Sequence, residues 1–383
     1  MQKVNKFLPV SRPALSEETI EEVVKVLRSG WLATGPITQQ FEGKLSEYFG
    51  GRTAMCFSSA TAGLQAALMA IGVGEGDEVI TTSMTFAATA NVIALLRAKP
   101  VFVDIDRTTF NIDPQRILDA CTSRTKAIMP VHYAGLPVDL DPIYEIAQRR
   151  NLRVIEDAAH AMGSAYKGKR IGTFGDIQVF SFHPIKNMTS GEGGCVVSNS
   201  PAEQRFLNLQ RFHGIDRSIW DRFSKNASCY YDVVYPGSKS NMSDLQSILG
   251  IHQLKEVEQL NAKRRTLADR YRIAFADVVD KIVPQGIPSY DFVHSGHLFP
   301  ICVADASSKD DLMSFLKENF IGTTPYYQPV HLFSYYRDTF GYKEGDLEHT
   351  EYVGKRIISI PLYPTLENYE QDYIIDTIKK FFR

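Results

Sequence analysis

The stretch AIMPVHYAGLPVDLDPIYEIAQRRNLRVIE, residues 127–156, holds two short apolar segments separated by a helical pattern. Residues 127–132 and 153–156 are predicted strands, and residues 142–149 have the apolar spacing of a helix that packs on a sheet. A strand, a helix and a second strand in this order are typical of a βαβ unit. This unit predicts a parallel sheet that is covered by helices.

The same alternation continues on both sides of this stretch, from residue 55 to about residue 197. Further strands are predicted at residues 55–57, 78–81, 100–105, 178–182 and 195–198, and further helices at residues 64–71 and 87–96. The short segment 183–194 separates the last two strands, and a parallel crossover usually needs a helix, so this pair is predicted to be antiparallel. The expected fold class is α/β, with a mainly parallel seven-stranded sheet flanked by helices.

The pattern changes after residue 243. Ser243 and Gln246 have the spacing of a capping box, and a charged helical pattern then runs to about residue 276. Beyond it we predict strands at residues 297–304 and 323–327 and helices at residues 310–319 and 369–382. A chain of 383 residues has room for two or three domains. We therefore expect a large α/β domain at residues 1–250 and a smaller α+β domain at residues 251–383.

The composition is that of an ordinary globular protein, with 44% hydrophobic and 22% charged residues. The 42 basic and 44 acidic residues give a net charge of −2, so nucleic acid is not an expected partner. The five cysteines include no CxxC pair, which argues against a zinc site and a disulfide framework. The amino-terminal residues lack the apolar core of a signal peptide, and a cytoplasmic location is expected.

A first motif of chemical interest is SSATAG, residues 58–63, between a predicted strand and a predicted helix. Free N–H groups at the amino terminus of a helix attract phosphate. The alternative interpretation is a turn of small residues that permits close packing.

A second motif is EDAAHA, residues 156–161, at the end of an apolar strand, where open α/β sheets bind ligands. Asp157 is suited to hold a cationic ring nitrogen, and His160 to contact a neighbouring oxygen. The alternative is a helix cap followed by a buried histidine. A metal pair is also conceivable, but the sequence provides no evident third ligand.

A third motif is SFHPIKNMTSGEGG, residues 181–194, which places Lys186 in a loop after a strand. A lysine can act as a Schiff-base nucleophile when desolvation lets its amine lose a proton, although most lysines are solvated surface charges. A phosphate-type turn, an acid at a strand end and a lysine after the next strand occur here in this order. Together they are what pyridoxal 5′-phosphate requires, namely an anion cradle, a partner for the pyridine nitrogen and an amine for the aldehyde.

Seven motifs extend this pattern over the chain from about residue 7 to the carboxyl end. They are SGWLATGP, SSATAG, GEGDEVI, VHYAG, EDAAHA, SFHPIKN and PLYP. In their order and spacing the chain resembles the DegT/StrS family of nucleotide-sugar aminotransferases, which have the fold type I pyridoxal phosphate transferase architecture. Within that family it is most similar to the branch that makes UDP-4-amino-4-deoxy-L-arabinose. The resemblance implies transfer of the amino group of L-glutamate to a 4-keto nucleotide sugar, either a UDP-4-keto-pentose or a 4-keto-6-deoxyhexose, in cell-surface polysaccharide or lipopolysaccharide biosynthesis.

The resemblance also implies roles for individual residues around the cofactor. Lys186 would form the Schiff base and move protons, Asp157 would pair with the pyridine nitrogen, and His160 would lie beside the phenolic edge of the ring. The remaining positions that match cofactor contacts are Ala60, Thr61 and Ser181 for the phosphate and Phe86 for stacking on the ring. From periodicity alone, Phe86 is a core residue.

Further matching positions lie outside these motifs. The segment GSKSNMSDLQ, residues 237–246, matches a loop that reaches the partner subunit's cofactor, which implies a homodimer with shared active sites; whether Lys239 or Asn241 makes that contact stays open. Positions that match the substrate pocket are Trp31, Thr34, His183 and His331. Without the resemblance, these residues are equally consistent with a surface loop and core aromatics.

Several functions compete with the leading one. A related group that dehydrates sugars carries histidine in place of Lys186, and a non-catalytic sensor or binding protein would need none of the three motifs. A family member that acts at another keto position is also open. The glycines at residues 72–79 follow a predicted helix instead of a strand, which argues against a nicotinamide oxidoreductase. The sequence leaves the sugar, the nucleotide and the stereochemistry of the new amine undetermined.

Overall fold

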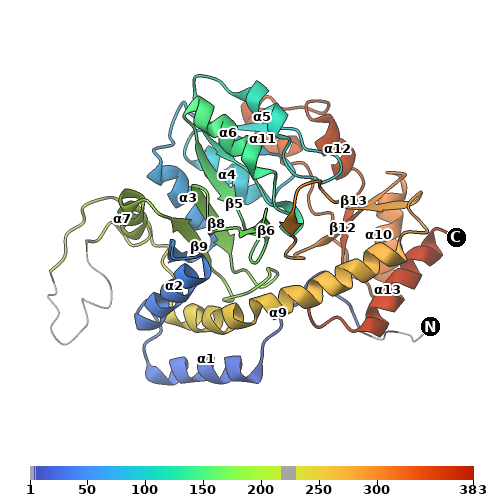
Figure 1. The fold of residues 1–383 in the computed structure, drawn as a ribbon, viewed down its shortest axis with the longest axis horizontal. Helices are drawn as coiled ribbons and strands as arrows, with labels where there is room; N and C mark the ends of the chain where they lie inside the picture. Colours follow the sequence, from blue (N-terminus) through green and yellow to red (C-terminus); the bar gives the residue numbers. More distant parts are fainter. Residues whose placement is uncertain (1–3, 5, 217–229) are drawn as a thin grey trace.

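Seven strands form the central sheet of the computed structural model, which describes residues 4, 6–216 and 230–383 (Figure 1). Cys229, one of the five cysteines, lies outside the described residues. The strands are β1 (Thr53–Phe57), β2 (Glu78–Thr82), β3 (Lys99–Val103), β4 (Thr125–Met129), β5 (Arg153–Asp157), β8 (Ile177–Ser181) and β9 (Gly194–Ser198). Their order in the sheet is β1-β9-β8-β5-β4-β2-β3. All seven predicted strands are therefore present in one sheet.

The sheet is parallel except at β9. The pairs β2 with β3, β2 with β4, β4 with β5 and β5 with β8 are parallel, whereas β9 runs antiparallel to both β8 and β1. Residues 182–193 contain no helix, so the chain turns back after β8. The predicted α/β class and the predicted antiparallel pair are confirmed.

Helices cover both faces of this sheet. They include α3 (Ala60–Ala70), α4 (Ala87–Leu95) and α7 (Pro201–Gln210), and also α2 (Pro36–Tyr48), α5 (Pro114–Ala120) and α6 (Leu140–Arg150). Successive strand residues point to opposite faces, so Cys56 joins the core that contains Phe41, while Met55 joins the core that contains Leu64. Burial on both faces explains why the central strands are apolar along most of their length.

Helix α9 (Asp244–Ala274) is 31 residues long and connects the sheet to the carboxyl-terminal elements (Figure 1). The predicted capping box is confirmed, because the Ser243 hydroxyl accepts a hydrogen bond from the Gln246 N–H. Val257 packs in the core of the large sheet, whereas Leu267 and Tyr271 pack in a second core. The helix thus crosses the predicted domain boundary between residues 250 and 251. The division of the chain into two domains at this point stays a prediction.

The second core lies between a three-stranded sheet, the end of α9 and two further helices. The sheet contains β10 (Ile282–Pro284), β12 (Phe299–Val303) and β13 (Ile357–Ile360), and the helices are α10 (Ser308–Glu318) and α13 (Asn368–Phe381). A further small sheet joins β6 (Ala165–Tyr166), β7 (Lys169–Arg170) and β11 (Phe292–Val293). Short elements complete the fold: η1 (Tyr133–Gly135), η2 (Val330–Leu332), α11 (Ser334–Phe340) and α12 (Glu348–Gly354).

The predicted strand at residues 323–327 is wrong. The segment makes a single bridge, between Thr324 and Ser359 of β13. The Tyr326 N–H then bonds to the Thr324 carbonyl at 2.9 Å, which closes a tight turn and takes the chain away from β13. Because of this turn, Tyr326 and Tyr327 leave the sheet and line a cavity.

The loop before α2 is held on the start of α9 by one buried carboxylate. Asp244 accepts hydrogen bonds from the N–H groups of Gly35 at 2.8 Å and Thr38 at 2.9 Å, and from the Thr38 hydroxyl at 2.7 Å. Gly35 is the N-cap of α2 and has no side chain, so Asp244 supplies the missing cap from a distant part of the chain.

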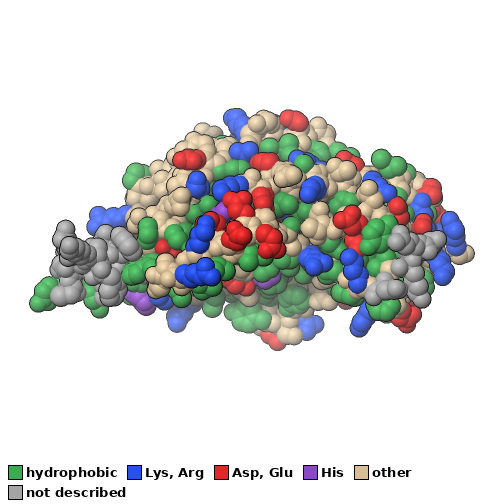
Figure 2. All heavy atoms as spheres, turned by 90° about the horizontal axis from the view of Figure 1, so that it is seen from below, with side chains coloured by type: hydrophobic (Ala, Val, Ile, Leu, Met, Phe, Trp, Pro, Cys, Tyr) green, Lys and Arg blue, Asp and Glu red, His purple; other side chains and the backbone are tan. Residues whose placement is uncertain are grey.

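Helix α1 (Glu17–Ser29) lies along α9 (Figure 1). It begins at the Ser16 cap, where the hydroxyl accepts the Thr19 N–H, and ends at Gly30 in the left-handed conformation. Figure 2 shows acidic side chains gathered on the face seen from below, the side on which α1 lies.

Among the helices in the described ranges, none combines the length and apolarity that a bilayer crossing requires.

Candidate active site

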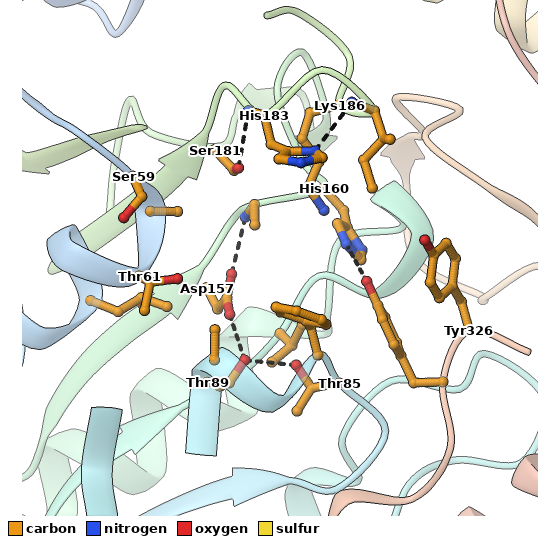
Figure 3. Close-up of a pocket in the computed structure, with 18 of the residues that line it drawn as sticks. Ser59, Thr61, Thr85, Thr89, Asp157, His160, Ser181, His183, Lys186 and Tyr326 are labelled. Atoms are coloured by element: carbon orange, nitrogen blue, oxygen red, sulfur yellow. Dashed lines mark hydrogen bonds between the residues drawn. The ribbon is translucent and has the colours of Figure 1, made fainter. Parts of the chain in front are cut away.

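A cavity of about 180 Å³ lies at the carboxyl ends of β5 and β8 (Figure 3). Asp157 is the last residue of β5 and Ser181 the last residue of β8. The structure brings eight of the predicted site residues into the wall of this cavity. They are Ala60, Thr61, Phe86, Asp157, His160, Ser181, His183 and Lys186.

One side of the cavity is the amino terminus of α3. The Ser59 hydroxyl caps this helix by accepting the Ala62 N–H at 3.1 Å, and the other N–H groups of the first turn have no partner within the helix. The backbone of β9 also approaches closely here, because a Cβ atom added to Gly194 would lie 2.5 Å from the Ala60 nitrogen. The SSATAG turn is therefore a close-packing turn, and its free N–H groups also make it suited to cradle an anion.

Opposite this cradle, Asp157 is only 5% exposed. One carboxylate oxygen accepts the Thr89 hydroxyl at 2.7 Å and the other accepts the Ala159 N–H at 3.1 Å. Burial raises the pKa of Asp157, and these two hydrogen bonds oppose that shift. Turns instead of a helix follow this residue, so the interpretation as a helix cap is wrong. A carboxylate fixed in this way is suited to hold a protonated ring nitrogen.

His160 is buried beside Asp157 and is hydrogen-bonded at both ring nitrogens. Its Nδ1 accepts the Ala134 N–H at 3.2 Å, and its Nε2 lies 3.0 Å from the Tyr327 hydroxyl. Burial lowers the pKa of His160 well below its ordinary value, so the ring is neutral near pH 7. A neutral ring that accepts at Nδ1 carries its proton on Nε2 and donates it to Tyr327. In the described part of the chain, no group of three or more acidic, histidine or cysteine side chains is placed to hold a metal.

Lys186 lies in the loop that turns back from β8 to β9. The loop is closed by the Phe182 N–H, which bonds to the Gly193 carbonyl at 2.9 Å. The next residue, Asn187, donates to Asn261 on α9 at 2.8 Å and so ties the loop to that helix. Burial lowers the pKa of Lys186 to about 8, although the charge of Asp157 acts in the opposite direction. The interpretation as a solvated surface charge is therefore wrong.

Three further predicted residues complete the wall. Phe86 is the N-cap of α4 and is 60% exposed, with its ring 6.2 Å from the Tyr327 ring, so it is not a core residue. The Ser181 hydroxyl accepts the His183 N–H at 3.4 Å. The His183 ring is 44% exposed and lies 3.8 Å from a carboxylate oxygen of Glu192.

Four predicted residues lie together elsewhere. Thr34 and Asn241 line a different cavity, of about 450 Å³. The Asn241 amide donates to the Thr34 hydroxyl and accepts from the Lys239 ammonium. Trp31 packs against Gly35, where an added Cβ atom would lie 2.3 Å from the indole nitrogen. None of the four is part of the wall that contains Lys186.

His331 is fully buried and is not among the residues that line either cavity, and its predicted place in the substrate pocket stays a prediction. Its Nδ1 lies 2.8 Å from the Ser83 hydroxyl and its Nε2 lies 3.2 Å from a Glu351 carboxylate oxygen. The short helix η2 turns the ring inward, where it joins the end of β2 to α12.

The sequence analysis missed several residues of the wall. Thr85 and Thr89 are four residues apart, and Thr89 passes a hydrogen bond from Thr85, at 2.7 Å, on to Asp157. Thr85 precedes the N-cap of α4 and Thr89 lies in the first turn of that helix, so their spacing in the sequence was only a weak signal for this contact. Tyr327 gave no such signal, because it reaches His160 only through the turn that ends at Tyr326.

The lowered pKa of Lys186 predicts how the cofactor-free protein reacts with the aldehyde of pyridoxal phosphate. The amine attacks only when it is uncharged, so we expect the rate to rise with pH and to level off above about pH 8. A solvated lysine, with a pKa of about 10.4, would show this rise more than two pH units higher. Stopped-flow absorbance between pH 6 and 10 measures the profile, and a rate that still climbs steeply at pH 10 would contradict the prediction.

The hydroxyl of Tyr327 predicts a second effect on cofactor binding. It accepts from His160, so its own hydrogen is free to bond to a group in the cavity. Replacement of Tyr327 by Phe leaves the buried Nε2–H without its acceptor, and we expect pyridoxal phosphate to bind about tenfold more weakly. Fluorescence titration of the cofactor-free protein measures this, with Tyr326→Phe as the control from the same wall. Equal affinity of both variants and the wild type would refute the role of Tyr327.

Comparison with known proteins agrees with this geometry. The sequence profile of the DegT/DnrJ/EryC1/StrS aminotransferase family matches residues 13–379. The spore coat polysaccharide biosynthesis protein SpsC of Bacillus subtilis is 41% identical over 383 residues, which cover 99% of this chain and 98% of SpsC.

Two solved structures are similar over their whole length. The pyridoxal phosphate form of Spr1654 from Streptococcus pneumoniae has a TM-score of 0.90 at 33% identity and covers 98% of each chain. PseC of Helicobacter pylori, an aminotransferase involved in pseudoaminic acid biosynthesis, has a TM-score of 0.91 at 31% identity, over 98% of this chain and 99% of PseC. The chain belongs to the DegT/DnrJ/EryC1/StrS aminotransferase family and has pyridoxal 5′-phosphate as its cofactor.

Proposed function

We propose that this aminotransferase moves the amino group of L-glutamate to a 4-keto nucleotide sugar that is used for a cell-surface polysaccharide. The observation that carries the proposal is that buried Asp157 and half-buried Lys186 line one cavity, beside the amino terminus of α3. SpsC, whose name refers to spore coat polysaccharide, and PseC, which is involved in pseudoaminic acid biosynthesis, support a sugar as the acceptor. A non-catalytic protein would have no need of a lysine with a lowered pKa.

The residues of the cavity fit the cofactor. The first turn of α3 and the Ser181 hydroxyl are suited to its phosphate, and Asp157 is suited to its pyridine nitrogen. Phe86 is exposed at the mouth of the cavity and can lie against the face of the ring. When bound, pyridoxal phosphate withdraws electrons from the carbon that carries the amine and makes its proton removable.

Protein groups then control where that proton goes. Lys186 Nζ, with its pKa near 8, can accept a proton from one carbon and return it to another close to neutral pH. Asp157 keeps the pyridine nitrogen protonated and is itself held by Thr89. Neutral His160 donates to Tyr327, whose own hydroxyl hydrogen would then be available to an oxygen of a bound ring or substrate.

We further propose that the enzyme is a homodimer whose subunits share their active sites. Thr34, Lys239 and Asn241 form one hydrogen-bonded group at a cavity separate from that of Lys186. Val233 and Val234 lead into this segment and are 53% and 51% exposed, which is unfavourable for neighbouring apolar side chains unless another surface covers them. A partner's cofactor site next to this cavity would cover the valines and use the charge of Lys239.

The amino transfer is tested with purified enzyme loaded with pyridoxal phosphate. We expect L-glutamate to bleach the near-visible absorbance of the bound cofactor, and a UDP-4-keto-pentose or a dTDP-4-keto-6-deoxyhexose to restore it. Mass spectrometry should then find an amine in place of the keto oxygen. Lys186→Ala should lose the response, and Lys167→Ala, at an exposed lysine, should keep it. An absorbance indifferent to glutamate would exclude glutamate as the donor.

The shared site is tested by mixing two inactive variants. If Lys239 serves the partner's site, Lys186→Ala and Lys239→Ala are each impaired as homodimers. A mixed dimer then has one intact site, so random mixing should restore roughly a quarter of the wild-type activity. If activity does not recover after subunit exchange, Lys239 acts in the site of its own chain. If Lys239→Ala alone is fully active, Lys239 has no role in either active site.

A further inference from the structure

A cavity of about 430 Å³ lies between the second half of α9, whose course is seen in Figure 1, and the segment that includes β11 and the start of β12. Its wall comes from the second half of α9 and from residues 285–300, and it shares no residue with the cavity of Lys186. The cofactor and the proposed amino transfer therefore leave it without a role.

Two guanidinium groups converge on this cavity. Arg265 and Arg272 are seven residues apart on α9, so they lie on the same face two turns apart. Arg272 donates to the Gln285 carbonyl at 2.7 Å, and its guanidinium lies 5.7 Å from the centre of the Phe299 ring. Arg265 differs, because its Nη1 is buried and has no hydrogen-bond partner among the described residues. A buried guanidinium nitrogen without an acceptor is costly, and an anionic ligand would remove that cost.

The remaining charges leave the cavity electropositive. Asp269 is the one acidic residue in its wall, it is exposed, and no ion pair within the described ranges joins it to Arg265 or Arg272. Burial and the charges of the two arginines lower the pKa of His294 to about 3, so this histidine is neutral near pH 7. It does not compete with the arginines for an anion, because its Nδ1 accepts the Gly296 N–H at 2.8 Å and its Nε2 lies 3.4 Å from the Gln285 side-chain oxygen.

The rest of the wall is apolar. Ile287 at the rim is 66% exposed and Val293 is 40% exposed, and Phe292, Leu298 and Phe299 also line the cavity, the last two with little exposed surface. A bare inorganic ion would leave this surface in water, whereas a flat apolar body would bury it next to the guanidinium groups.

We propose that this cavity is a second binding site, for an organic anion that joins a carboxylate, phosphate or sulfonate head to an apolar body. The head bonds to the guanidinium groups of Arg265 and Arg272 once the Arg265 side chain turns its unpartnered Nη1 toward the cavity, and the body lies between Ile287 and Phe299. Planar oxyanions suit a guanidinium group because both can form two parallel hydrogen bonds.

The test uses the enzyme fully loaded with pyridoxal phosphate and 8-anilinonaphthalene-1-sulfonate as a fluorescent probe. We expect one saturable site per chain, from which 1-naphthyl phosphate and 1-naphthoate displace the probe; their relative strengths show which head is preferred. Arg265→Gln should weaken probe binding about tenfold. Arg270→Gln is the matched control, because Arg270 lies on the same helix but pairs with Asp372 on α13.

A second pair of variants avoids the buried arginine. Ile287→Glu places a negative charge at the exposed rim and should also weaken binding, whereas Ile287→Gln should leave it nearly unchanged. The near-visible absorbance of the bound cofactor and the thermal midpoint check that each variant is folded. Probe binding that is the same in wild type, Arg265→Gln and Ile287→Glu would overturn the proposal, as would the absence of a saturable site.

Discussion

The return of the chain between β8 and β9 is the constraint on which the site depends. In a parallel sheet, a crossover helix would carry the chain away from the carboxyl end of β8. Here β9 is antiparallel to β8, so residues 182–193 stay at that end and fold over it. The carboxyl end of β5 lies next to β8, and it carries Asp157. The lysine and the carboxylate therefore meet because of one change in strand direction.

Burial then gives these groups their chemistry. The same removal of water raises the pKa of Asp157, lowers that of Lys186 and keeps His160 neutral. The shift of Asp157 is limited by a specific contact, the hydrogen bond from the Thr89 hydroxyl. In a less buried site the lysine would be protonated near neutral pH. Without the hydrogen bond from Thr89, the pKa of Asp157 would rise further, and the carboxylate would lose its charge more easily. The threonine hydroxyl behind the carboxylate thus allows a charged acid and a partly uncharged amine to share one small cavity.

The large sheet could be predicted because its strands are buried on both faces and are separated by helices with clear periodicity. The proximity of Lys186 to Asp157 could be predicted, because each residue follows or ends a strand and the two strands are neighbours in the sheet. The two-residue strands β6, β7 and β11 are too short to show a period. Residues 323–327 look like a strand, but a turn at Tyr326 redirects them. The contacts of His331 could not be predicted, because the sequence does not show which way a side chain points, and only the packing of η2 turns its ring inward.

Helix α9 is the part that joins the separate regions of the molecule. At its start, Asp244 fixes the loop that carries Trp31 and Thr34 next to the segment with Lys239 and Asn241. Asn261, 17 residues further on, fixes the loop of Lys186, which at 1.5 Å per residue is about 26 Å away along the axis. A continuous helix is stiff over this length, so it holds these two contact points at a constant separation, while Ser240 also accepts the Ser58 N–H of the SSATAG turn at 2.7 Å. Shared active sites require such a spacer, because each chain must present two parts of different sites at once.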